Sequence, residues 1–118
     1  MSDYEKLNVW QKAHKLTLET YMLTKQLPKE ELFGLTSQIR RAAVSVESNI
    51  AEGESRFSNA DKIRFFIDAR SSAAEVETQL LIISDLYAKS TKSAIKLRED
   101  YKYLGKQINS LISFRRKT

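Results

Sequence analysis

The side chains that most often carry out catalysis are scarce in this chain of 118 residues. It has no cysteine and one histidine, His14. Thiol catalysis, iron–sulfur clusters and cysteine zinc sites are therefore excluded. A carboxylate-bridged two-metal site in a helical bundle needs Glu-x-x-His pairs, and Gln11 stands three residues before His14. We expect no catalytic residue, no metal site, no cofactor and no enzymatic activity, and we place His14 at the protein surface or at its boundary with the core.

Polar side chains with more varied chemistry recur at helical spacing in the middle of the chain. On two antiparallel helices they would face each other as a buried polar ladder, with Arg41–Glu75 and Arg56–Glu52 as ion pairs. Such networks fix the register and the neighbours of helices, and direct contact with a ligand is the alternative role. The residues of this predicted polar network are Gln38, Arg41, Ser45, Asn49, Glu52, Arg56, Ser72 and Glu75.

Positive charge is concentrated toward the C-terminus. Residues 89–118 carry a net charge of +7 and residues 1–88 a net charge of −2, within a total of +5. This asymmetry predicts an acidic partner for the C-terminal quarter, nucleic acid above all. The alternative is that the lysines only keep one helix face solvated. The predicted phosphate contacts are Lys92, Lys96, Lys102, Lys106, Arg115, Arg116 and Lys117.

Four helices are predicted to position these side chains. Apolar residues recur every three or four positions in four segments, and the chain has only three glycines and one proline. Short connections force consecutive helices to run antiparallel, so we predict one all-α domain over residues 1–118, an up-down-up-down antiparallel four-helix bundle. The four segments are residues 7–27, 29–53, 58–87 and 91–115.

Three local signals mark the ends of these helices. Pro28 separates the first two, because the residue before a proline is disfavoured in helical conformation. Leu32 is predicted to open the buried stripe of the second helix, and Gly53 to end that helix in a left-handed conformation. Ser58 is predicted to cap the third helix, with Asp61 three residues later.

Two features of the sequence indicate where in the cell the protein is located. No apolar run approaches the roughly 20 residues that cross a bilayer. The N-terminus MSDYEKLNVW lacks the basic and then apolar layout of a secretory signal. We therefore expect a cytoplasmic protein without membrane association.

Two stretches carry a resemblance to a known family. LPKEELFGLTSQIRRAAVSVESNIAEGESRFS (27–58) and FFIDARSSAAEVETQL (65–80) resemble the four-helix-bundle proteins encoded in 23S rRNA intervening sequences. LNVWQKAHKL (7–16) is similar to the opening helix of that family. The sequence departs from the family pattern at Val46, where isoleucine is usual, and at Ser71, where glycine is frequent.

The resemblance implies a small bundle that assembles as a homopentamer. It also implies a more distant likeness to the accessory protein of diversity-generating retroelements, which binds nucleic acid and a reverse transcriptase. No catalytic residues come with the family. Its name describes where the gene lies and does not describe an activity.

We therefore predict a bacterial, non-enzymatic oligomer that binds RNA through its basic C-terminal helix. With no aromatic platform on strands, recognition would follow the shape and backbone of the RNA. The alternative is an adaptor that binds another protein through its apolar and polar stripes, with the charge serving solubility. A third hypothesis is a small-ligand or toxin-like regulator.

Overall fold

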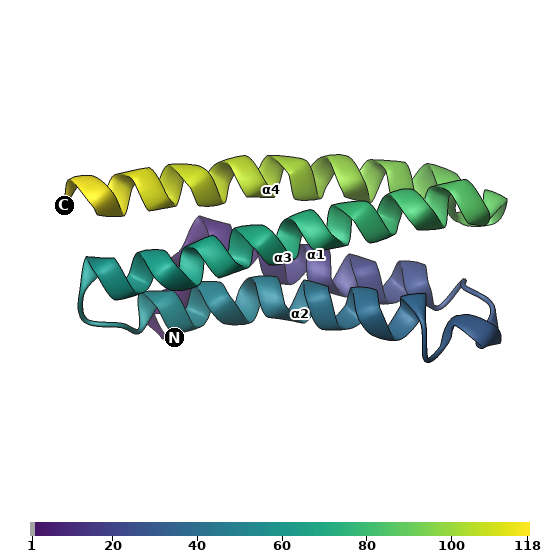
Figure 1. Cartoon of the computed structure of the whole chain (residues 1–118), viewed down its shortest axis with the longest axis horizontal. Coiled ribbons are helices and arrows are strands. Elements are labelled where there is room, and N and C mark those ends of the chain that lie inside the picture. Colours follow the sequence, from purple (N-terminus) through teal and green to yellow (C-terminus); the bar gives the residue numbers. More distant parts are fainter. Residues whose placement is uncertain (1) are drawn as a thin grey trace.

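The computed structural model describes residues 2–118, in which consecutive α-helices run antiparallel along one long axis (Figure 1). The fold is thus the predicted all-α, up-down-up-down bundle, measuring 46 × 21 × 21 Å. The helices are α1 (Asn8–Thr24), α2 (Leu35–Glu54), α3 (Asn59–Leu86) and α4 (Thr91–Lys117). Short 3-10 helices precede or join them: η1 (Asp3–Lys6), η2 (Lys29–Glu31) and η3 (Ala88–Ser90).

The start of α2 differs from the prediction, which began this helix at residue 29. After Pro28 the chain forms η2 and a turn, and α2 begins only at Leu35. Gly34 has φ −113° and ψ −111°, backbone angles outside the helical region that glycine adopts at little cost. Leu32, predicted to be buried, consequently lies on the turn and is 51% exposed.

The end of α2 also differs from the prediction. Gly53 lies inside the helix, and no glycine among residues 2–118 has a positive φ, so the predicted left-handed cap is wrong. The helix ends with Ser55 in ordinary right-handed conformation. Gly53 serves close packing instead: a Cβ there would lie 2.7 Å from Cε1 of Phe66 and 3.0 Å from Cβ of Phe65.

The ends of the other helices agree with the prediction to within a few residues. Ser58 caps α3 as predicted, because its Oγ accepts a hydrogen bond from the backbone N–H of Asp61 at 3.1 Å. α1 ends at Thr24, three residues early, because Leu27 turns tightly and its N–H bonds to the Thr24 carbonyl. α4 continues two residues beyond its predicted end, to Lys117.

The core is one cluster of apolar side chains from all four helices. Large side chains such as Phe66, Leu80 and Leu104 are fully buried. Small residues, among them Ala43 and Ala73, are buried on α2 and α3. Because small side chains shorten the distance between packed helices, α2 and α3 lie together along most of their length.

α1 carries a row of buried threonines at its contact with the rest of the bundle. Thr17 donates to the Ala43 carbonyl of α2 at 3.3 Å, and Thr24 accepts from Nε of Arg40 at 2.8 Å. The hydroxyls of Thr20 and Tyr101 are 3.1 Å apart, joining α1 to α4. Burial raises the pKa of Tyr101, so its hydroxyl stays protonated over the physiological range.

Candidate nucleic-acid interface

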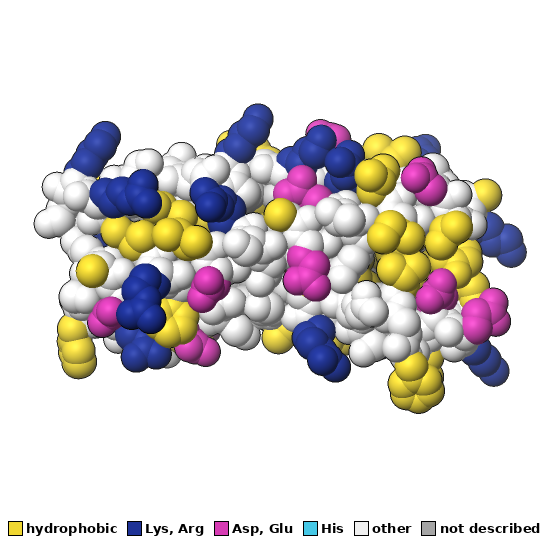
Figure 2. Space-filling model, viewed as in Figure 1, with side chains coloured by type: hydrophobic (Ala, Val, Ile, Leu, Met, Phe, Trp, Pro, Cys, Tyr) yellow, Lys and Arg dark blue, Asp and Glu magenta, His cyan; other side chains and the backbone are white. Residues whose placement is uncertain are grey.

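The predicted phosphate contacts lie on one long helix with a clear inner and outer side. α4 buries a regular stripe that includes Leu97, Tyr101, Leu104 and Ile108 against the other helices. The cationic side chains project from the opposite side, and Figure 2 shows several of them along the α4 edge of the molecule. Six of the seven predicted contacts are exposed: Lys92, Lys96, Lys102, Lys106, Arg116 and Lys117.

Acidic neighbours on α4 partly neutralise this outer face. Nζ of Lys96 lies 3.0 Å from Asp100, and this hydrogen bond raises the pKa of Lys96. Lys102 lies 4.0 Å from Glu99, at the limit of an ion pair. Such exposed pairs are weak and are screened by salt, so a polyanion can compete with them.

The seventh predicted contact, Arg115, is held inside the molecule. Its Nη2 donates to both carboxylate oxygens of Glu54, at 2.7 and 3.0 Å. Lys62 approaches the same residue from α3, and its Nζ donates to the Glu54 carbonyl at 2.6 Å. The side chains of Arg115 and Glu54 are only 18% and 15% exposed. Arg115 therefore joins α4 to α2, and its guanidinium group is occupied by Glu54 and not by a ligand.

Part of the predicted polar network is present between α2 and α3. The hydroxyls of Ser45 and Ser72 are 2.9 Å apart and join the two helices. Asn49 donates from Nδ2 to both the carbonyl and the hydroxyl of Ser45, at 2.9 and 3.0 Å. These half-buried groups satisfy one another and support the predicted role in helix register.

The rest of that network is exposed on the single chain, so the predicted ladder is not buried within one protomer. Arg56 and Glu52 form the predicted ion pair at 3.9 Å, near the end of α2, and Arg56 also covers the ring of Phe65. Arg41 and Glu75 form no ion pair within the described residues.

The reason is geometric: these positions are beside the buried stripe and not on it. The exposed members are Gln38, Arg41, Glu52, Arg56 and Glu75. Several of them border a shallow groove of about 520 Å³ between α2 and α3.

His14 lies at the protein surface, as predicted. Its Nδ1 is 2.9 Å from Glu47, and its ring stacks on Trp10 with centroids 5.0 Å apart. The sequence pattern did not pair His14 with Glu47, which lies on another helix.

Two further side chains lie beside the candidate interface and were not identified from the sequence. Arg70 of α3 and Tyr103 of α4 border a groove between these helices. Arg70 stands in a segment without excess charge, and only the antiparallel pairing brings it to α4. Tyr103 left a weak signal, an aromatic residue on the charged side of α4.

No helix formed by residues 2–118 combines the length and the apolar character that a membrane crossing needs. Within the same residues, no group of three or more His, Cys, Asp or Glu side chains could hold a metal ion.

Comparisons with known proteins agree with this architecture. A solved structure from Bacteroides thetaiotaomicron, described as a protein of unknown function from the S23 ribosomal protein family, superimposes with a TM-score of 0.78. It is 23% identical, and the match covers 88% of this chain and 97% of that chain. No curated protein matches the chain. The family model described as 23S rRNA-intervening sequence protein matches residues 5–110. The chain belongs to the 23S rRNA-intervening sequence protein family.

Proposed function

We propose that this protein is a non-enzymatic RNA-binding bundle that contacts the phosphate backbone through the outer face of α4. The observation that carries the proposal is the row of six exposed cationic side chains on that face. Lys92, Lys106, Arg116 and Lys117 have no side-chain partner within residues 2–118. Their charges are free to replace the counterions of a polyanion.

The distribution of charge supports a directed contact. The segment 89–118 carries +7 and the remainder of the chain −2, so a polyanion is attracted to one side of the molecule. RNA is the nucleic acid we propose, as predicted from the sequence, and the bacterial cytoplasm is the proposed location.

The proposal includes a homopentamer, as the family resemblance implies. Large apolar side chains are exposed near the end of the bundle that holds η2 and η3, where a second copy can cover them. They include Met22, Leu32, Phe33, Ile82 and Leu86. Five copies would also place five basic faces on one particle, multiplying the phosphate contacts.

Salt-dependent binding to RNA tests the proposal. We suggest fluorescence anisotropy with a labelled single-stranded RNA in a series from low to high salt. The variant Lys92→Gln/Arg116→Gln/Lys117→Gln removes three cations from the outer face of α4. We expect it to bind more weakly and to lower the slope of log affinity against log salt by about 2.

The matched control removes the same charge elsewhere. Lys15→Gln/Lys25→Gln/Lys29→Gln alters three exposed lysines that lie on α1, after it and in η2. We expect this variant to keep most of the wild-type slope. Equal losses in the two variants would refute the α4 interface, and no binding at low salt would refute it and also favour the protein-adaptor hypothesis.

A further inference from the structure

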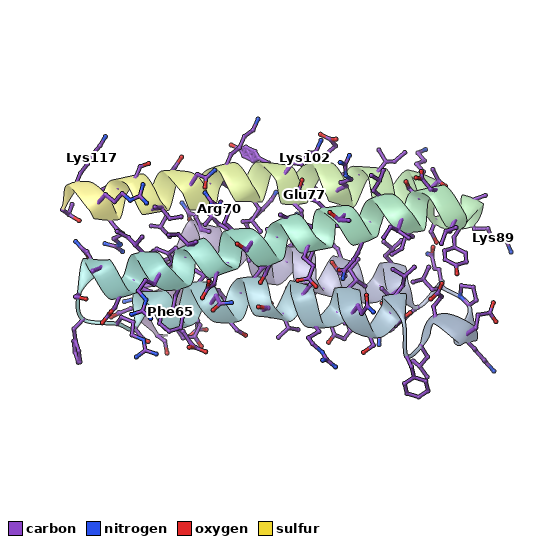
Figure 3. The ribbon with its side chains drawn as sticks, in the orientation of Figure 1. Phe65, Arg70, Glu77, Lys89, Lys102 and Lys117 are labelled. Atoms are coloured by element: carbon purple, nitrogen blue, oxygen red, sulfur yellow. The ribbon has the colours of Figure 1, made fainter. Side chains whose placement is uncertain are left out.

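The outer surface of the bundle is hollowed between α3 and α4. The groove has a volume of about 750 Å³, within the roughly 300–1,000 Å³ usual for small-ligand sites. Figure 3 shows Arg70 and Glu77 on α3 and Lys102 on α4, flanking the line where the two helices meet. This groove shares Lys102 and Lys106 with the proposed RNA-binding face and extends it onto α3.

Small residues leave the groove open. Ser71 and Ala74 line it from α3, and Gly105 lines it from α4. A Cβ on Gly105 would meet no atom within 4 Å, so nothing in the protein fills this space. The charged and aromatic side chains around it can therefore surround a bound group without first moving aside.

The groove contains side chains of both charges, and these have few strong partners within residues 2–118. Arg70 donates to Oδ1 of Asn109 at 3.2 Å, and Lys102 makes only the long contact with Glu99. The half-buried carboxylate of Glu77 has no side-chain hydrogen bond or ion pair in the described part of the chain, and neither has Lys106. The Glu77 carboxylate is therefore available to a ligand that donates N–H groups.

The ligand must carry an anion and N–H donors close together. A simple phosphate would be repelled by Glu77 and Glu99, and a simple cation by Arg70, Lys102 and Lys106. An unpaired nucleotide meets both demands, since its phosphate suits the cations and its base edge suits a carboxylate. Guanine offers two adjacent N–H groups, which match the two oxygens of one carboxylate.

Tyr103 supplies the remaining element of such a site. It borders the groove and is 56% exposed, so its ring can receive a base. Stacking on an aromatic ring is the usual way in which proteins hold unpaired bases. The ring, the carboxylates and the cations lie on two adjacent helices that pack tightly, which fixes the backbone positions of the site.

We propose that the groove between α3 and α4 binds an unpaired guanine nucleotide of single-stranded RNA. Glu77 accepts hydrogen bonds from the base edge, Tyr103 stacks on the base, and Arg70, Lys102 and Lys106 contact the flanking phosphates. The inference rests on the proposed RNA-binding function and adds base selectivity to it.

Binding to four labelled oligonucleotides tests this site. Each is a 12-nucleotide uridine strand in which one central position is G, A, C or U. For the wild type we expect about tenfold tighter binding of the G-containing strand than of the all-uridine strand. Glu77→Gln should bring this ratio close to one without weakening binding to the all-uridine strand, because it also removes a negative charge.

Two further variants separate selectivity from general effects. Asp68→Asn removes an exposed carboxylate from the same helix outside the groove, and it should keep the wild-type ratio. Tyr103→Leu should weaken binding of every strand about tenfold. Circular dichroism melting of each variant shows that it remains folded.

The outcomes distinguish the two proposals. If all four strands bind wild type equally and with steep salt dependence, the guanine site is refuted and the α4 interface stands. A ratio that survives in Glu77→Gln likewise refutes the site. If no strand binds at low salt, both proposals fail.

Discussion

At the scale of single side chains, Glu54 connects three helices. Its carboxylate accepts both hydrogen bonds from Arg115 of α4, and Lys62 of α3 lies 3.8 Å from it. All three side chains are mostly buried, so water screens these charges less than it screens exposed pairs. Removing one partner would leave an uncompensated charge in a partly dry site.

We therefore predict a large difference between two adjacent arginines. Arg115→Ala should lower the free energy of unfolding by about 2–3 kcal/mol, because Glu54 loses its bidentate partner. Arg116→Ala, which removes an exposed side chain, should change it by less than about 0.5 kcal/mol. Urea unfolding of the two variants measures both values. Similar losses in the two would show that Arg115 adds nothing beyond its helix propensity.

Tyr87 gives a second prediction, for alkaline pH. Its hydroxyl donates a hydrogen bond to Glu31, and this bond raises the pKa of Tyr87 from 10.0 to about 12. Below pH 10 the phenol is protonated in both the folded and the unfolded chain, so the bond contributes fully. Between about pH 10 and 12 the unfolded chain loses the proton first, and the contribution declines.

The measurement compares wild type with Tyr87→Phe across this range. We expect the difference between their urea midpoints to be constant from pH 8 to 9.5 and to shrink as the pH approaches 11. Lysine titration affects both proteins equally and cancels in the difference. A gap that stays the same at every pH would show that Tyr87 does not donate to Glu31.

The candidate interface was predictable in part at this scale. A stretch rich in Lys and Arg opposite a regular apolar stripe was enough to place Lys92, Lys106 and Lys117 on a solvent-facing side. Arg115 is also basic, but it is drawn inward by an ion pair with Glu54, which is 61 residues away in the chain. Local periodicity contains no information about such a contact.

At the scale of helices, two glycines inside helices serve opposite purposes. Gly53 lets α2 approach the phenylalanines of α3, whereas the space beside Gly105 is open. Gly53→Ala should destabilise the fold by about 1–3 kcal/mol, since overpacking outweighs the gain in helix propensity. Gly105→Ala should stabilise it by up to about 1 kcal/mol. Thermal melts test both signs, and stabilisation by Gly53→Ala would show that Phe66 moves aside easily.

The helices themselves were predictable because their apolar periodicity is long and regular. The error at the start of α2 has a local cause. Residues 29–32 continue the pattern of the helix, but Gly34 permits a break that periodicity does not register. The prediction of a left-handed cap at Gly53 was wrong for a different reason. A glycine near a helix end suits a left-handed cap and a close contact equally well.

At the scale of the whole molecule, the two ends of the bundle each expose a phenylalanine. Phe33 follows η2 and is 93% exposed, beside the end of α3 that carries Leu86. Phe57 is fully exposed in the turn between α2 and α3, at the opposite end. Under the proposed assembly, the end with several exposed apolar side chains is the one that contacts another copy.

Light scattering tests the assembly directly. Five copies of 13.6 kDa give a particle of about 68 kDa, which we expect for wild type. Phe33→Ser/Leu86→Ser should shift the mass toward the monomer, whereas Phe57→Ser should leave it unchanged. A monomeric wild type would refute the pentamer. An effect of Phe57→Ser alone would move the contact to the other end.

The buried threonines of α1 have a consequence for how the helix can slide. Leu16 and Leu23 are seven residues apart, so displacing α1 by two turns would put one leucine in the place of the other. Thr17 and Thr24 are also seven residues apart, whereas Thr20 would be replaced by Ala13 or Leu27, so the contact between the hydroxyls of Thr20 and Tyr101 would be lost. Apolar burial holds α1 against the bundle, and the contact between Thr20 and Tyr101 favours one position of α1 along its axis.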